Sequence, residues 1–237
     1  MKLIFLGSGG AFEKTHSALW VEDKTNILID CGLTVPQSII NFFDRLILPD
    51  YIIITHSHAD HYFGLPILIL KQALFENNKE VKIISNDDVL NKINRLLDLA
   101  YGDIFEDFHP NIKLINYKDI NQIGDIEISF LECKHGKINS LSLKLEKNKK
   151  KIVYMVDKEF DEKQIVFAKD CDILIHEGDI IGIHTTLEEL KKLITESNPK
   201  LLVITHYPKE NINKITETLD KRVPIIFAER ELVMEMY

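Results

Sequence analysis

Side chains of the kinds that bind metals cluster directly after a strongly apolar run, and this cluster constrains the fold more than any other feature of the sequence. Residues 51–54 are Tyr-Ile-Ile-Ile, and they are followed closely by three histidines and an aspartate: His56, His58, Asp60 and His61. Imidazole nitrogens are the commonest metal ligands in proteins and carboxylate oxygens their usual harder companions, so the cluster favours zinc or a similar divalent ion. A polar loop that is rich in His by chance is the weaker alternative, because His rarely clusters without a metal or an acid-base task.

The spacing of these four residues favours two ions rather than one. If the segment continued as a strand, His56, His58 and Asp60 would project to one face and His61 to the other. One ion could not easily collect all four side chains, but two ions could. The remaining ligands must then come from elsewhere in the chain.

Further ligand-type residues also follow short apolar runs. Such runs predict buried strands, and groups just past the carboxyl ends of such strands gather in one crevice, which is the predicted active site. The runs are 52–55 before His56, 152–156 before Asp157, 172–175 before His176-Glu177, and 201–205 before His206. Ile-Thr-His occurs at both 54–56 and 204–206. This echo hints, on three residues only, that the two halves of the chain are built alike.

The pattern His-x-His-x-Asp-His, with Asp157 and His206 further along, resembles the metallo-β-lactamase superfamily. Within that superfamily the chain is most similar to ribonuclease Z and its phosphodiesterase relatives. Four short motifs carry this second likeness: Leu6-Gly7-Ser8-Gly9-Gly10-Ala11, Ile29-Asp30-Cys31-Gly32, His176-Glu177-Gly178 and His184-Thr185-Thr186. The resemblance runs nearly end to end and implies an α/β fold, the four-layered αββα sandwich.

The resemblance also implies a set of ligands for two metal ions. His56, His58 and His135 would bind one ion, Asp60, His61 and His206 would bind the other, and Asp157 would bridge them. His135 follows the alternating segment 126–130, which is where a strand would deliver it. Two Zn²⁺ are the default cofactors, although Mn²⁺ or Fe fits the same nitrogen and oxygen donors.

Two metals in this arrangement suit hydrolysis. A bridging water loses its proton near neutral pH when bound to zinc, and paired ions stabilise both the attacking and the leaving oxygen, which fits phosphate diesters best. Asp60 could orient the metal-bound hydroxide. By resemblance, His184, held by Glu177, would be the general acid for the leaving group. The alternative for His184 and Glu177 is that they only cap or solvate a turn.

One departure from ribonuclease Z bears on the substrate. In ribonuclease Z the interval between the residues matching His135 and Asp157 holds a long arm that grips tRNA, and the interval 136–156 has no room for it. The chain carries 29 basic and 37 acidic residues, a net charge of −8, whereas proteins that clamp tRNA usually show a basic face. The lysines at 144, 147 and 149–151 indicate a solvated hairpin tip.

We therefore expect a phosphodiesterase that acts on a small or cyclic phosphodiester. RNA remains an alternative partner, through tRNA 3′ endonuclease activity. Hydrolysis of a thioester, ester or lactone is a second alternative, and a non-catalytic metal-binding protein is a third.

Length and composition favour one compact enzyme domain over residues 1–237. Hydrophobic residues make up 45% of the chain, and no Pro/Ser-rich linker divides it. No apolar stretch is long enough for a membrane span and no signal sequence is evident, so we expect a cytoplasmic protein. Three widely spaced cysteines, Cys31, Cys133 and Cys171, indicate small buried fillers rather than disulfides or a Cys-based zinc site. The oligomeric state is open, with a homodimer as one arrangement.

Local patterns predict several elements. Residues 18–21 and 26–29 are typical of a hairpin pair, and the segments from Gly64 to about Phe75, from 87 to 101 and from 186 to 196 are typical of helices. Gly7-Ser8-Gly9-Gly10 lacks the spacing and the Lys of a phosphate loop, so it predicts a tight turn beneath the metal site.

Overall fold

Two seven-stranded sheets form the framework of the computed structural model, which describes residues 1–180, 182–219 and 222–236. The chain divides into two compact units. The first unit comprises Met1–Gly7, Ala11–Ile120 and Arg230–Tyr237, and the second comprises Ser8–Gly10 and Asn121–Glu229. A single domain over 1–237 stays a prediction.

The sheet of the first unit has the strand order β14-β1-β2-β3-β4-β5-β6. Its strands are β1 (Lys2–Gly7), β2 (Ala18–Glu22), β3 (Ile27–Ile29), β4 (Tyr51–Ile53), β5 (Val81–Ser85), β6 (Ile112–Asn116) and β14 (Val233–Glu235). The pairings from β14 to β3 are antiparallel, and those from β3 to β6 are parallel. The predicted hairpin pair is confirmed as β2 and β3.

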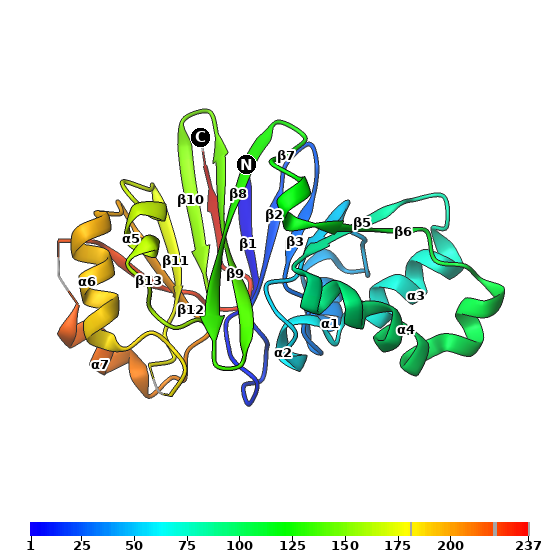
Figure 1. The fold of residues 1–237 in the computed structure, drawn as a ribbon, viewed down its shortest axis with the longest axis horizontal. Coiled ribbons are helices and arrows are strands. Elements are labelled where there is room, and N and C mark those ends of the chain that lie inside the picture. Colours follow the sequence, from blue (N-terminus) through cyan, green and yellow to red (C-terminus); the bar gives the residue numbers. More distant parts are fainter. Residues whose placement is uncertain (181, 220–221, 237) are drawn as a thin grey trace. The chain divides into compact units, whose positions relative to one another are not determined.

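Helices of the first unit lie beside its sheet (Figure 1), and apolar side chains of the helices and the sheet pack together. The helices are α1 (Val35–Phe43), α2 (Ala59–Tyr62), α3 (Leu65–Phe75) and α4 (Asp87–Asp107), with a 3₁₀ turn, η1, at Tyr117–Asp119. Ile39 of α1, Leu68 of α3 and Ile93 of α4 belong to one buried cluster with Trp20 and Ile52 of the sheet. The apolar residues that gave the strand and helix patterns therefore form one core.

The sheet of the second unit has the order β13-β12-β11-β10-β9-β8-β7. Its strands are β7 (Gln122–Ile123), β8 (Ile126–His135), β9 (Ile138–Lys147), β10 (Lys150–Met155), β11 (Ile173–Glu177), β12 (Leu202–Thr205) and β13 (Ile225–Phe227). Three helices, α5 (Lys163–Phe167), α6 (Leu187–Ser197) and α7 (Asn211–Thr218), lie beside β10 to β13 (Figure 1). Leu190 and Leu193 of α6 pack with Val153, Leu174 and Leu202 of the sheet.

The two sheets repeat one pairing pattern. The pairings from β7 to β10 are antiparallel and those from β10 to β13 are parallel, which is the sequence of pairings from β14 to β6. By this correspondence β3 matches β10, and each is followed by an aspartate with positive φ, Asp30 at 62° and Asp157 at 53°. Asp tolerates the left-handed conformation better than most residues. The prediction that the two halves are built alike is therefore supported. The repeated Ile-Thr-His does not mark equivalent strands, however, because β4, which precedes His56, corresponds to β11, whereas His206 follows β12.

The predicted elements are largely confirmed, with one correction. The expected helices are present as α3, α4 and α6, and the lysine-rich segment is a hairpin tip between β9 and β10. The strand considered for the histidine cluster is wrong, because β4 ends at Ile53 and Asp60 and His61 lie on α2. The α/β class is confirmed as two mixed sheets with helices. In the described part of the chain, no helix is long and apolar enough to cross a membrane.

Candidate metal and catalytic residues

The first unit presents the histidine cluster between the end of β4 and the short helix α2. His56 and His61 are fully buried, Asp60 is 7% exposed, and His58 is exposed. Helix α2 begins at Ala59, so Asp60 and His61 sit in its single turn, while His56 and His58 belong to the extended segment before it. This bend brings ligand-type side chains together that a straight strand would place on opposite faces.

His56 and His58 form the first pair of donors. The Nδ1 atom of His56 lies 3.0 Å from Thr55 Oγ1, and its Nε2 atom lies 3.0 Å from His58 Nδ1. The Thr55 hydroxyl is within hydrogen-bond distance of the Asp30 carboxylate, so it donates there and can accept from His56 Nδ1–H. Nε2 of His56 then carries a lone pair that converges with Nδ1 of His58, as two nitrogen ligands of one ion require.

His61 is oriented by a buried carboxylate. Its Nδ1 atom lies 2.9 Å from Asp30 Oδ2, and both side chains are fully buried. Its Nε2 atom lies 3.4 Å from Asp60 Oδ2. A carboxylate on one ring nitrogen fixes the tautomer and leaves the other nitrogen available as a ligand, which makes His61 and Asp60 a second pair of donors.

Close backbone packing holds this cluster in place. A Cβ atom on Gly32 would lie 2.0 Å from the Asp60 carbonyl oxygen, so only glycine fits there. The amide of Gly64 donates to the Cys31 carbonyl at 2.7 Å. The motif Ile29-Asp30-Cys31-Gly32 thus supports the cluster twice, through the Asp30 carboxylate and through the missing side chain of Gly32.

The second unit gathers its own set at the carboxyl ends of parallel strands. Asp157 follows β10, Glu177 ends β11 and His206 follows β12, and all three side chains are buried. The Nδ1 atom of His206 lies 3.1 Å from Asp157 Oδ1. A Cβ atom on Gly10 would lie 2.9 Å from His206 Cε1. The glycine-rich opening therefore packs against a predicted metal ligand. The tight turn expected at residues 7–10 is not there, because Gly7 ends β1 and Gly9 forms a bridge, and the turn follows at residues 11–12.

His184 and Glu177 form the pair that was expected from the sequence. The Nδ1 atom of His184 lies 2.7 Å from Glu177 Oε2, and its Nε2 atom lies 3.7 Å from Asp179 Oδ2. Burial alone would lower the pKa of His184, but the hydrogen bond and charge of Glu177, with Asp157 and Asp179, raise the pKa to about 9. His184 is therefore held as a cation by carboxylates, which is the form a general acid needs.

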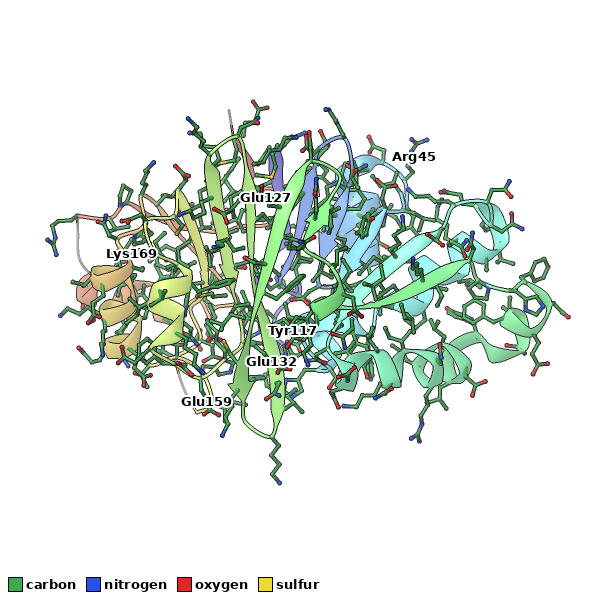
Figure 2. All side chains as sticks on the ribbon, turned by 45° about the horizontal axis from the view of Figure 1, so that its top comes forward. Arg45, Tyr117, Glu127, Glu132, Glu159 and Lys169 are labelled. Atoms are coloured by element: carbon green, nitrogen blue, oxygen red, sulfur yellow. The ribbon has the colours of Figure 1, made fainter. Side chains whose placement is uncertain are left out.

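His135 ends β8, as the alternating pattern predicted, and it is 2% exposed. Its ring centroid lies 5.2 Å from that of His184. Glu159 ties this strand end to the Asp157 turn, because its amide donates to the Lys134 carbonyl and its Oε1 atom accepts from Gly136 N at 3.0 Å. Figure 2 shows Glu132 on β8 and Glu159 near the same end of the second sheet.

Sequence reasoning missed the supporting roles of Asp30, Lys158 and His176. Asp30 and His176 belong to the motifs that carried the resemblance, so the sequence indicated their positions but not their contacts. Lys158 gave no signal, because lysine is rarely buried. Burial lowers the pKa of Lys158 against the opposing charge of Glu177, and it holds the pKa of His176 well below the usual value.

The donors present in each unit fit a divalent metal. Imidazole nitrogens and carboxylate oxygens suit Zn²⁺, Mn²⁺ or Fe²⁺, and the pairs His56–His58 and Asp60–His61 in the first unit each converge. In the second unit, Asp157, Glu177 and His184 form a further group whose ligand atoms lie within 4.8 Å of one another.

Comparisons with known proteins agree with this chemistry. The family model described as anti-Pycsar protein Apyc1 matches residues 1–231. The chain is 28% identical to the anti-Pycsar protein Apyc1 of Paenibacillus sp. (strain J14), over 87% of this chain and 89% of that protein. It is 26% identical to ribonuclease Z of Nanoarchaeum equitans, over 86% and 82% of the two chains.

A solved structure supports the fold. The metallo-β-lactamase fold protein YhfI from Bacillus subtilis aligns with a TM-score of 0.80 at 19% identity and covers 98% of both chains. At this identity the likeness concerns the fold alone, and it confirms the fold class implied by the sequence motifs.

Proposed function

Because this chain belongs to the family of the anti-Pycsar protein Apyc1, we propose that it is a metal-dependent phosphodiesterase that hydrolyses a small cyclic phosphodiester, such as a cyclic nucleotide. Its metallo-β-lactamase fold and its ribonuclease Z-like relatives make it a metallo-hydrolase of that branch. What we propose beyond this is that the bond hydrolysed is a phosphodiester and that the substrate is small.

We propose zinc as the metal, with manganese or iron as alternatives for the same donors. One ion would be held by His56, His58 and His135, the other by Asp60, His61 and His206, with Asp157 shared. This assignment is the one that the resemblance to ribonuclease Z implies. It is supported by the donor pairs His56–His58 and Asp60–His61 in the first unit and by the contact of His206 with Asp157 in the second. Bound ions would supply positive charge that acidifies a coordinated water and stabilises phosphate oxygens.

The residues of the chain supply the remaining chemistry. Asp60 accepts hydrogen bonds and would orient the attacking oxygen. His184 would give its Nε2 proton to the departing alkoxide, because Glu177 occupies its Nδ1 side at 2.7 Å and keeps the ring cationic. The single observation that carries the proposal is this carboxylate-held histidine beside the buried ligand Asp157, with His184 Nδ1 lying 3.6 Å from Asp157 Oδ1. Esters with good leaving groups need no such acid, whereas alkoxides leaving phosphorus do.

The preference for a small substrate is supported by how the interval 136–156 folds. The hairpin of β9 and β10 takes up almost all of it, and its tip is the pair Asn148 and Lys149. The lysines of this hairpin are partly neutralised, since Lys144 pairs with Glu146 and Lys147 with Asp125. The hairpin is therefore shorter than a protruding tRNA-gripping arm, and part of its positive charge is already paired with carboxylates.

A turnover screen of the metal-loaded protein tests the proposal. Cyclic nucleotides, bis-p-nitrophenyl phosphate, a pre-tRNA and a lactone would be compared at fixed salt, with Asp157→Ala as the inactive control. We expect hydrolysis of the cyclic and generic phosphodiesters. Turnover of the lactone alone would overturn the proposal in favour of ester chemistry, and no turnover of any substrate would favour a non-catalytic metal-binding protein.

Elemental analysis tests the ligand set. We expect two ions per chain, and Asp157→Ala should lose metal as well as activity. Asp125→Ala is the matched control, because Asp125 is an exposed aspartate of the same unit that lies outside the proposed ligand set and pairs with Lys147. Clearly less than one ion per chain in the metal-replete wild type would contradict the assignment. We also propose a cytoplasmic location, which fractionation of the source cells would test.

A further inference from the structure

A lysine lies fully buried next to the candidate catalytic pair and has no part in the ligand set. The side chain of Lys158 is 0% exposed. Its Nζ atom lies 3.0 Å from His176 Nε2 and 3.9 Å from Glu177 Oε1. Lysine is almost never fully buried unless it is paired, so the fold keeps this side chain inside for a reason that its partners must explain.

The hydrogen bonds around His176 define the direction of the Lys158 contact. The Nδ1 atom of His176 lies 2.9 Å from the carbonyl oxygen of Glu177, and a carbonyl can only accept, so Nδ1 carries the proton. Nε2 is then the acceptor, and Lys158 Nζ donates to it. His176 therefore fixes the position of the Lys158 amine without competing with Glu177 for it.

The Lys158 amine faces the Glu177 carboxylate, which has several hydrogen-bond partners. Its Oε2 atom accepts from the Asp157 amide at 3.0 Å and lies 2.7 Å from His184 Nδ1. Its Oε1 atom accepts from the amides of Lys158 at 3.2 Å and Thr185 at 3.4 Å. One carboxylate thus joins the turn that carries Asp157 to the loop that carries His184.

A second contact joins the same two segments, because Thr185 Oγ1 donates to the Lys158 carbonyl at 3.1 Å. Asp157 has a positive φ of 53°, a conformation that its surroundings must hold. A buried carboxylate is stabilised when positive charge lies near both of its oxygens. His184 Nδ1 lies 2.7 Å from Oε2, and the Lys158 amine lies 3.9 Å from Oε1.

We propose that Lys158 is a positioning residue: its amine, held by His176, fixes the Glu177 carboxylate, which in turn orients His184 and the Asp157 turn. The consequence for turnover rests on the proposed function, whereas the ordering of the two segments does not. Lys158 acts through Glu177 and His184 and touches no substrate in this scheme.

Amide hydrogen exchange tests the ordering without any substrate. Lys158→Met keeps the length of the side chain but removes the amine. We expect the amides of Asp157 and Thr185, which donate to Glu177, to exchange at least about tenfold faster in this variant, while the amide of Val203 within β12 is unchanged. Unchanged exchange at Asp157 and Thr185 would overturn the proposal.

A control variant and a second variant of the same contact complete this test. Lys200→Met removes an exposed lysine of the same unit, whose Nζ lies 2.7 Å from Asp172 Oδ1, and it should leave the exchange of Asp157 and Thr185 unchanged. If Lys158→Met does not fold, His176→Leu removes the acceptor instead and should give the same acceleration. His176→Gln, which keeps an acceptor near the Nε2 position, should restore slow exchange, and a failure to do so would count against the proposal.

A double-mutant cycle tests the catalytic consequence. Lys158→Met should lower turnover of an alkoxide-leaving phosphodiester by about tenfold or more, and it should cause a clearly smaller further loss in a His184→Ala background, because part of its effect acts through His184. Equal losses in both backgrounds would show a general structural role. If the wild type hydrolyses no phosphodiester, the proposed function fails, and the exchange experiment still decides the role of Lys158.

Discussion

At the scale of single residues, two carboxylates do similar work in the two units. Asp30 holds His61 through Nδ1, and Glu177 holds His184 through Nδ1. The proposed histidine ligands could be chosen from the sequence because histidine is scarce and the spacing was specific. The orienting role of Asp30 could not be predicted, because aspartate is common and its role depends on which ring nitrogen it faces. A buried lysine such as Lys158 lies outside what composition or spacing can indicate.

His184→Ala separates acid catalysis from metal binding. The variant should keep its metal yet lose ~10²–10⁴-fold in turnover on substrates with alkoxide leaving groups, the range for a lost general acid. A p-nitrophenolate departs without a proton, so turnover of bis-p-nitrophenyl phosphate should fall much less. Steady-state kinetics with both substrates and metal analysis measure the ratio of the two losses. Equal losses, or a loss of metal, would make His184 a structural or ligand residue.

The charge on His184 predicts a pH dependence in the metal-free protein. Its pKa is raised from 6.5 to about 9, against the effect of burial, by Glu177, Asp157 and Asp179. A raised folded-state pKa contributes stability that is fully present below pH 6.5 and is lost as the pH rises through about 9. Nitrogen-15 NMR titration of the imidazole should therefore show a cation at neutral pH.

Two variants check the cause of that shift. Glu177→Gln keeps an acceptor for Nδ1 but removes the nearest charge, so the pKa of His184 should fall toward or below its ordinary value, because burial then dominates. Asp179→Asn removes a charge that lies farther away, at 3.7 Å from Nε2, and should lower the pKa less. A larger fall in Asp179→Asn than in Glu177→Gln would contradict this account.

At the scale of elements, strand ends were predicted better than the segments that follow them. Apolar runs located β4, β10, β11 and β12, and a proposed ligand or acid-base residue lies at or just beyond the carboxyl end of each. The turn of α2 was not predicted, since four residues give no helical period. The helix expected over 87–101 continues to Asp107, and the predicted end coincides with a break at Tyr101, where φ is −149°. The apolar pattern used for the prediction ends at this break, although α4 continues beyond it to Asp107.

The capping box of α6 gives a stability prediction at this scale. Thr186 Oγ1 accepts from the Glu189 amide at 3.3 Å, and Glu189 Oε2 accepts from the Thr186 amide at 2.9 Å. Thr186→Ala should lower the free energy of unfolding by about 1 kcal/mol, measured by urea denaturation of the metal-loaded protein. Thr186→Ser keeps the hydroxyl and should restore most of it. The same loss in both variants would show that the methyl group, and not the cap, stabilises this helix end.

At the scale of the whole molecule, the two sheets repeat one pairing pattern, but the proposed ligands do not follow equivalent strands, since β4 before His56 corresponds to β11 whereas His206 follows β12. The equivalent strands β3 and β10 share the positive-φ aspartate, although only Asp157 belongs to the proposed ligand set. The pairing of β14 with β1 joins Val233–Glu235 to Lys2–Ile4. A single sequence could not predict this pairing, because a three-residue edge strand carries almost no pattern and its partner lies at the other end of the chain.

The charge and connectivity of the whole chain predict its preference among phosphodiesters. With a net charge of −8 and a short hairpin between His135 and Asp157, the protein should turn over cyclic or generic phosphodiesters by a wide margin over pre-tRNA. The physical reason is that tRNA binding draws its affinity from basic groups that displace counterions from the backbone, and its strength then falls steeply with salt. Competition assays at two fixed salt concentrations measure both quantities. Tight, salt-sensitive binding of pre-tRNA with efficient 3′ cleavage would contradict the prediction and would require a basic surface elsewhere on the protein.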